Sequence, residues 1–319
     1  MEKTLPERPL LKPWYRLAYE NDRVVLEYGQ AALTFQGAAT QRLLPALLPL
    51  LDGERTLEEI GSYLGESISP AIRHALELLA RHGAIVAGPA RAERPRPFRD
   101  AAWYLAAASS EEIDAASLPL TRSRVAVRGT GPVAEEIARL LRLAGVEELE
   151  HQAWSEDAGG GTDLVVAAPD PGELPRLAEL NALALRAGFP WLQILPFDGR
   201  YASIGPLFVP GETCCYSCFR LRQAANLEYP LELRALERSK ASYPTPSPLV
   251  SALAGLTTTL ALHWLGCRDP SLPGVLHALE LQPACIVTRH LVYRVPRCPA
   301  CSGLEELAAP RPWFEATPC

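Results

Sequence analysis

The sequence predicts an α/β protein of two domains. Its 319 residues exceed what one hydrophobic core usually absorbs, short strands and then three helices fill the first ninety residues, and strands later alternate with helices around a glycine-rich turn. The first pattern is typical of a winged helix-turn-helix, and the second of a Rossmann-like α/β domain. We expect domains at 1–90 and 123–319, with a linker or arm at 91–122 that is rich in proline and arginine.

The composition is that of a soluble globular protein. Apolar residues make up 48% and charged residues 21%, and the net charge of −6 with a pI near 5.6 disfavours bulk nucleic-acid binding. Only three of the 31 basic residues are lysines: Lys3, Lys12 and Lys240. No apolar run of signal-peptide length opens the sequence, so we expect a cytoplasmic protein with reduced cysteines.

The N-terminal domain begins with three short segments that are rich in β-branched or aromatic residues. These expected strands are 15–20, 24–29 and 31–35. A leucine-rich helix is expected at 39–51, where Pro45 and Pro49 blur its start or kink it. A strand at 84–88 can close the domain.

Two further helices have recognisable ends. Thr56 and Glu59 form a capping box that opens the second helix, and Gly65 closes it. Ser69 and Pro70 are expected at the N-cap and N1 positions of the third helix. The apolar face of this third helix consists of Ile72, Ala75, Leu76 and Leu79.

The other face of the third helix bears on DNA binding. It carries Arg73, His74, Glu77, Arg81 and His82. This mixed charge differs from the strongly basic surface of a DNA-reading helix. A zinc-containing transcriptional regulator is therefore an alternative that the sequence disfavours.

The second domain begins with a βαβ-type pattern. The expected strands are 124–128, 148–154 and 163–168, and the expected helices are 133–144 and a second one that ends near Leu185. An apolar stretch at 247–266 contains several hydroxyl side chains and His263, so we expect a buried core helix there instead of a membrane span.

Two CxxC pairs are the strongest chemical signal. Cys215 and Cys218 form one pair, and Cys298 and Cys301 form the other. Four thiolates at this spacing suit a tetrahedral structural zinc site, which leaves no position for a catalytic water. Cys214 is an alternative to Cys215, and a redox dithiol is the alternative chemistry.

A glycine turn of the form G-x-G-x-x-A spans Gly129 to Ala134, between a strand and a helix. Such a turn suits a nucleotide phosphate at the helix N-terminus, and it also occurs as plain scaffold. The acidic residue that binds the ribose of a dinucleotide is not at the end of the next strand, where Trp154 and Ser155 stand, so dinucleotide binding is disfavoured.

The motifs of residues 124–302 resemble, in their order, the ThiF/MoeB/HesA adenylating enzymes. The residues that carry the resemblance are DLVVAAPD at 163–170, Asn181, GFPWLQ at 188–193, ETCCYSC at 212–218 and the second CxxC pair. The cofactor-binding positions that it implies are Gly129, Gly131 and Asp170. In that family a nucleotide-binding arginine and lysine precede the aspartate; here that segment is essentially deleted, and Pro171 replaces an asparagine. Because a triphosphate needs positioned cations, we expect a vestigial site and no ATP bound by this chain.

Residues 11–88 resemble the PqqD-like winged-helix modules that bind leader peptides of ribosomally made, modified peptides. The segments that carry this resemblance are LKPWYRLAYENDRVVLEYG, LLPALLPLLDGERTLEEI and LLARHGAIV. The fusion of such a module to a degenerate ThiF-like domain resembles the ocin-ThiF-like partner proteins of thiazole/oxazole-modified peptide pathways. The two resemblances together cover about nine tenths of the chain.

This second resemblance implies a peptide site. The leader would lie antiparallel along the third strand, in the groove against the third helix. The residues implied are Ala32, Leu33, Thr34, Phe35, Ile72, Arg73, Leu76 and Leu79. The apolar members are equally expected as plain core of a winged helix, and both interpretations stay open.

The resemblances together imply a function. The chain would bind a precursor's leader and deliver its core to a separate YcaO-type cyclodehydratase for azoline formation, without catalysis of its own. The alternative is an ATP-dependent adenylating enzyme that acts on a peptide or sulfur-carrier C-terminus. Expected partners are the leader, the cyclodehydratase and a second copy of the chain, without nucleic acid or membrane.

Overall fold

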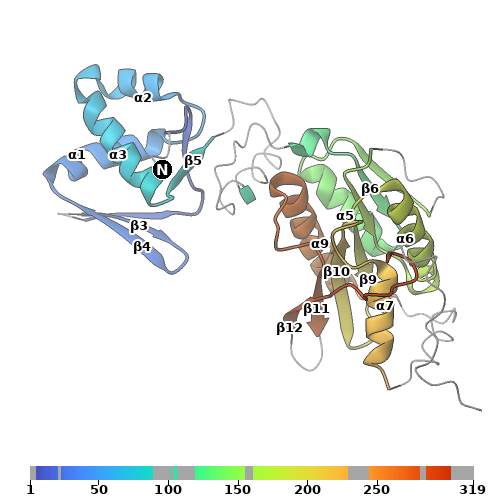
Figure 1. The fold of residues 1–319 in the computed structure, drawn as a ribbon. Coiled ribbons are helices and arrows are strands. Elements are labelled where there is room, and N and C mark those ends of the chain that lie inside the picture. Colours follow the sequence, from blue (N-terminus) through green and yellow to red (C-terminus); the bar gives the residue numbers. More distant parts are fainter. Residues whose placement is uncertain are drawn as a thin grey trace, which may run out of the picture. The chain divides into compact units, whose positions relative to one another are not determined.

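The chain divides into two compact units, Met1–Pro119 and Leu120–Cys319, in the computed structural model. The structure describes residues 5–20, 23–88, 101, 104–105, 119–154, 161–228, 244–280 and 285–302. Most of the expected linker at 91–122 lies outside these residues. Figure 1 shows both units.

A three-stranded antiparallel sheet opens the first unit. Its strands are β2 (Arg16–Glu20), β3 (Arg23–Tyr28) and β4 (Ala31–Gln36), in the order β2-β3-β4. Val24 and Leu26 of the central strand are buried against the helices, and Leu33 and Phe35 lie opposite them on β4. The three expected strands are confirmed. Alternate side chains of β3 and β4 lie on the core side, whereas all five residues of β2 are exposed.

Three helices follow the sheet. They are α1 (Ala38–Leu47), α2 (Leu57–Leu64) and α3 (Ser69–Arg81), with 3₁₀ turns at Leu48–Leu50 and Glu66–Ile68. The single helix expected at 39–51 ends earlier, since Pro49 has no N–H to continue it, whereas Pro45 is accommodated inside α1. A small ribbon of β1 (Pro9–Leu11) and β5 (Ile85–Ala87) completes the unit.

The start of α3 differs from the prediction. Ile68 is the N-cap, without a side-chain cap, and Ser69 is already the first helical residue. The preceding 3₁₀ turn leads directly into α3, so the chain enters the helix one residue earlier than the serine signal indicates.

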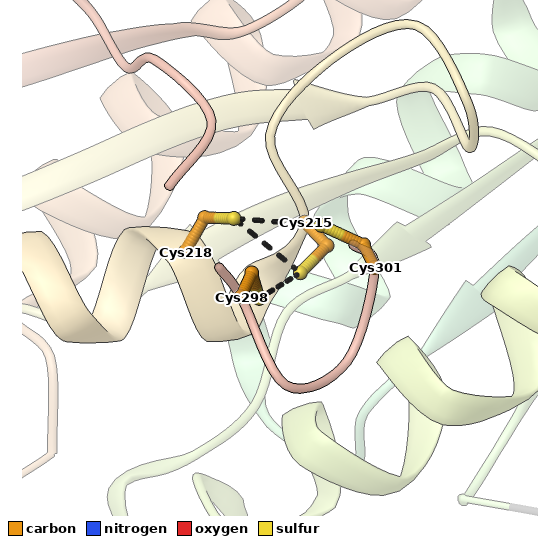
Figure 2. Close-up of side chains that lie close together, drawn as sticks. All are labelled: Cys215, Cys218, Cys298 and Cys301. Carbon is orange, nitrogen blue, oxygen red and sulfur yellow. Dashed lines mark hydrogen bonds between the residues drawn. The ribbon is translucent and has the colours of Figure 1, made fainter. Parts of the chain in front are cut away.

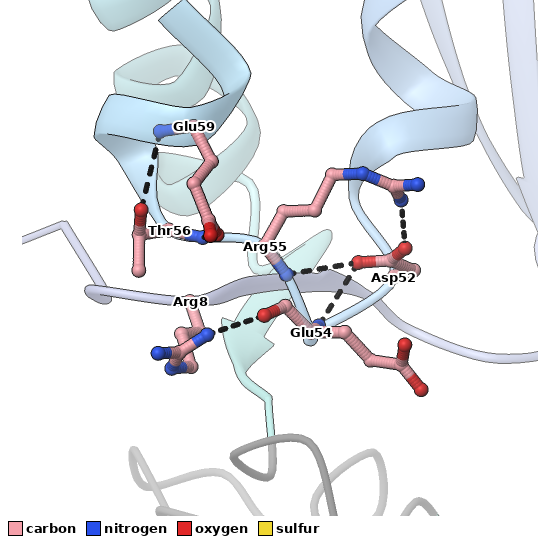
Figure 3. A network of polar contacts seen from close by, with 6 residues as sticks. All are labelled: Arg8, Asp52, Glu54, Arg55, Thr56 and Glu59. Carbon is pink, nitrogen blue, oxygen red and sulfur yellow. Dashed lines mark hydrogen bonds and ion pairs between the residues drawn. The ribbon is translucent and has the colours of Figure 1, made fainter.

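The start of α2 agrees with the prediction and is part of a polar network (Figure 3). The Glu59 N–H donates to Thr56 Oγ1 at 3.2 Å, and the Thr56 N–H donates to Glu59 Oε2 at 2.8 Å. Asp52 accepts from the N–H groups of Glu54 and Arg55, and Arg8 donates to the Glu54 carbonyl. The network therefore ties the N-terminal segment to the beginning of α2.

A seven-stranded sheet is the centre of the second unit, in the order β12-β11-β10-β9-β8-β6-β7. The strands are β6 (Val125–Arg128), β7 (Leu149–Gln152), β8 (Leu164–Ala167), β9 (Trp191–Leu195), β10 (Tyr201–Phe208), β11 (Val275–Glu280) and β12 (Ile286–Leu291). The first four pair in parallel, and the last three add antiparallel strands. The expected βαβ-type start is confirmed.

Helices cover both faces of this sheet (Figure 1). α5 (Pro132–Leu143) packs against α9 (Ser247–Cys267) on one side, while α6 (Arg176–Ala187) and α7 (Tyr216–Ala225) pack around Trp191 and Phe208 on the other. Within the described chain, α9 is the one helix that is long and apolar enough to cross a membrane. Its buried residues contact the sheet, as expected of a core helix.

Candidate functional site

Four cysteines from two distant segments meet in one cluster (Figure 2). The Sγ–Sγ distances are 3.8 Å for Cys215 and Cys218, 3.6 Å for Cys215 and Cys298, and 3.5 Å for Cys218 and Cys301. A tetrahedral ion with Zn–S bonds of about 2.3 Å places its sulfurs about 3.8 Å apart. These four residues can therefore hold one metal ion.

The two pairs are held by different elements. Cys215 is the N-cap of α7 and Cys218 lies in its first turn, whereas Cys298 and Cys301 lie in the loop after β12. Cys218 Sγ accepts from the Val295 N–H at 3.3 Å, which is the type of bond that stabilises a metal-bound thiolate.

Two arginines hold the loop after β12, which carries Cys298 and Cys301. Arg222 of α7 donates to the carbonyls of Tyr293 and Arg294, and Arg294 donates to the carbonyls of Gly211 and Cys301. The CxxC spacing did not predict these contacts, although Arg222 stands one turn after Cys218 in the sequence. They link the loop that carries Cys298 and Cys301 to the helix that carries Cys218.

Burial and neighbouring groups move the thiol pKa values apart. Burial raises the pKa of Cys215 and that of Cys301. The pKa of Cys218 is lowered, because hydrogen bonds from the Val295 N–H and from neighbouring groups outweigh its burial. Cys214 is outside the cluster, in the core, where burial raises its pKa to about 12. Cys215, and not Cys214, thus faces the other three sulfurs.

The glycine turn lies at the N-terminus of α5. A Cβ at Gly129 would collide with the backbone of Ala168, and a Cβ at Gly131 would collide with the carboxylate of Asp170. Thr130 Oγ1 donates to Glu173 at 2.9 Å. Burial first, and then the carboxylates of Glu173 and Glu135, raise the pKa of Asp170. The Asp170 carboxylate therefore packs against the glycine turn, with the carboxylates of Glu173 and Glu135 nearby, and the sequence has no lysine between Lys12 and Lys240.

The predicted peptide-binding strand is the edge strand β4. No other strand pairs with its outer side within the part of the chain that the structure describes. The hairpin has a two-residue turn and closes on the pair Tyr28 and Ala31, so the N–H groups of Ala32 and Thr34 point to the open edge. The side chains of Leu33 and Phe35 are half-buried against the core.

The predicted residues of α3 have different surroundings. Leu79 is fully buried in the core. Ile72, Arg73 and Leu76 line a surface pocket of about 760 Å³ between α2 and α3. This pocket is a feature that the sequence analysis did not predict, because only the packing of the two helices creates it. The implied single groove of strand and helix is thus not lined by Leu79.

Comparisons with known proteins give fold relatives. No family model and no curated protein matches the chain. Among solved structures, the heterocyclase TruD matches with a TM-score of 0.68 and 24% identity, over 93% of this chain and 43% of TruD. A heterocyclase in complex with substrate and cofactor matches with a TM-score of 0.70 and 25% identity, over 94% of this chain and 40% of its own.

Another relative is E. coli MccB with AMPCPP and MccA, at a TM-score of 0.63 and 13% identity, over 92% of this chain and 99% of MccB. The chain shares the fold of these proteins. It spans about two fifths of the length of the two heterocyclases. The mixed α/β fold with its seven-stranded sheet is thus one found in heterocyclases and in MccB.

Proposed function

We propose that the chain binds the leader region of a ribosomally made precursor peptide. It then delivers the core of that peptide to a separate YcaO-type cyclodehydratase that forms azolines. The fold relatives support a peptide partner, since one is a heterocyclase in complex with substrate and another is MccB with MccA. The chain's own residues bind and position, and they supply no catalytic group in this proposal.

The open edge of β4 carries the proposal. An extended leader added antiparallel to β4 would accept hydrogen bonds from the N–H groups of Ala32 and Thr34, which gives affinity from the main chain. The half-buried Leu33 and Phe35 would supply apolar contacts on the side that faces the helices. We assign the first unit the role of a winged-helix recognition module.

The metal in the cysteine cluster is zinc in this proposal, with a structural role. Four sulfurs fill a tetrahedral shell, so no position is left for a water or a substrate. The ion would join α7 to the loop after β12 and would stabilise the second unit as a scaffold.

The glycine turn does not fit a nucleotide triphosphate. Asp170 lies over Gly131, with Glu173 and Glu135 close enough to raise its pKa. Phosphate charge there would meet carboxylates without a positioned lysine. We therefore derive no step through ATP in this chain, and we assign ATP use to the partner enzyme.

The test measures binding of a fluorescein-labelled leader to the full chain by fluorescence anisotropy. The probe is the synthetic leader of a precursor peptide, whose gene is first to be sought among the neighbouring reading frames. Thr34→Pro removes one edge N–H, and since this N–H points away from β3, the ladder within the sheet is kept. Thr34→Val keeps the N–H and is the matched control.

We expect saturable binding by the wild type and by Thr34→Val, and at least tenfold weaker binding by Thr34→Pro. Equal binding by both variants, or none by the folded wild type, would contradict the proposal. The alternative is an adenylating enzyme, since MccB with ATP shares this fold. It requires ATP–pyrophosphate exchange by this chain alone, and we expect none.

A further inference from the structure

The pocket between α2 and α3 is a second feature of the first unit that can contact a partner. Its apolar floor is formed by Leu57 of α2 and by Ile72 and Leu76 of α3, with Leu5 at one side. The volume of about 760 Å³ is in the range of pockets that take a large side chain or a short peptide segment.

The rim of this pocket carries charged side chains of both signs. It includes Glu58 of α2, Glu66 of the following turn and Arg73 of α3. All three are exposed, and within the described residues none of their side chains makes an ion pair or a hydrogen bond. Unpaired charges of opposite sign around an apolar floor would favour one orientation of a charged ligand.

The pocket and the β4 edge share one core. Ile72 and Leu76 belong to the same hydrophobic cluster against which Leu33 and Phe35 of β4 pack. The N-terminal segment also reaches the pocket, since Leu5 lines it and the Leu57 N–H donates to the Glu7 carbonyl at 3.1 Å. The polar network of Figure 3 holds this segment at the start of α2, so the pocket is built on fixed elements.

We propose that this pocket is a second anchor for the same precursor peptide. It takes one bulky apolar side chain of the leader, with a basic residue beside it that faces Glu58 and Glu66. An acidic residue of the leader would pair with Arg73. This inference rests on the proposed function, and it adds a sequence preference that strand addition at β4 does not supply, because main-chain bonds are nearly independent of sequence.

Gly61 offers a way to fill the pocket. It lies in α2 and lines the pocket, and a Cβ there would contact Ser69 Oγ at an ordinary 3.5 Å. Gly61→Ala therefore fits and leaves most of the pocket open, whereas Gly61→Leu projects three further carbons into it. Ser62→Trp blocks the exposed rim without entering the core, and serves if Gly61→Leu does not fold.

The experiment selects peptides from an mRNA-displayed library of random 20-residue sequences on the full chain. We expect enriched peptides to contain a bulky apolar residue next to Lys or Arg. Their binding should fall at least tenfold in Gly61→Leu and in Ser62→Trp, and remain in Gly61→Ala. In the double variant Glu58→Lys/Glu66→Lys, selection should favour Asp or Glu in place of the basic residue.

The inference is overturned if no such pair is enriched, or if the enriched peptides bind Gly61→Leu and Ser62→Trp as tightly as Gly61→Ala. The two hypotheses fail separately. Loss of the Thr34→Pro effect removes strand addition at β4, whereas loss of the Gly61→Leu and Ser62→Trp effects removes only the second anchor.

Discussion

Single side chains decide how the cysteine cluster is assembled. Asn181 of α6 is 4% exposed, and its Oδ1 accepts the Tyr216 N–H at 2.9 Å, at the first residue of α7. The first N–H groups of a helix have no partner within it, so this contact fixes the helix end that carries Cys215 and Cys218. The sequence offers Asn181 only as part of a family resemblance, and the contact gives it a physical role.

Asn181→Ala removes the acceptor of this buried N–H. We expect a loss of about 1–3 kcal/mol in the free energy of unfolding, measured by urea denaturation. Asn226→Ala is the control, since this exposed amide bonds only the Arg222 carbonyl at the other end of α7, and we expect a change within about 0.5 kcal/mol. Equal effects of both substitutions would show that Asn181 has no special role.

Cys298→Ser tests the metal ligands. Cys298 is fully buried beside Cys215, and a serine hydroxyl there is a poor ligand for a thiophilic ion. We expect zinc content, measured by plasma mass spectrometry on the purified protein, to fall from about one ion per chain to well below one half. Cys285→Ser, at an exposed cysteine outside the cluster, should retain the metal. If both variants retained the metal, Cys298 would not be one of its ligands.

At the scale of elements, sequence signals for the start of a helix agree with the structure where all the residues of the signal lie close together in the chain. The capping box of Thr56 and Glu59 is present as predicted, because both of its hydrogen bonds are made within four residues. The serine signal at Ser69 is wrong by one position, since the preceding 3₁₀ turn continues into α3. Local rules therefore hold best where no neighbouring element competes.

Thr56→Ala deletes the cap of α2. We expect a loss of about 1 kcal/mol in the stability of the first unit, seen as a lower midpoint in urea denaturation. Thr56→Ser keeps the acceptor oxygen and should stay close to the wild type. If the alanine and serine variants unfold at the same midpoint, the capping bond adds nothing measurable.

At the scale of the whole molecule, the candidate metal site lies within one of the two units. The cluster lies in Leu120–Cys319, and its ligands are about eighty residues apart in the sequence. A bound ion therefore closes a long loop within that unit and leaves the first unit without a direct contribution.

Chelation tests this separation. We expect EDTA to lower the melting temperature of the second unit in calorimetry and to leave the transition of the first unit unchanged. A matched run with calcium-saturated EDTA at equal ionic strength controls for salt. A shift of both transitions, or of neither, would contradict a structural ion confined to one unit.

The pH dependence of metal binding follows from the thiols. Burial raises the pKa of Cys215 and that of Cys301, so without metal these groups are protonated at neutral pH, and an ion must displace the protons. We expect affinity, measured by competition with a colorimetric chelator, to rise with pH and to fall on acidification. An affinity that is constant with pH would mean that binding displaces no protons.

The sequence by itself predicted the three-stranded sheet and three helices of the first unit, the βαβ start of the second, the four cysteines of the candidate metal site and the glycine turn. Each of these is encoded by spacing or periodicity within a short segment, and the CxxC spacing favoured Cys215, with Cys214 as an alternative that the structure places outside the cluster. The tertiary structure decided which apolar residues of α3 line a surface pocket. Ile72, Leu76 and Leu79 are all buried in the core, and the packing of α2 on α3 places Ile72 and Leu76, but not Leu79, in the wall of the pocket.

Tertiary structure also decided the state of the glycine turn. Gly131 and Asp170 are 39 positions apart, and only the parallel pairing of β6 with β8 places the carboxylate over the turn. The motif specifies a backbone that can bind a phosphate. The carboxylates near it come from α5, which carries Glu135, and from the segment after β8, which carries Asp170 and Glu173. For this reason the glycine turn could be predicted from the sequence, whereas the carboxylates around it could be identified only from the fold.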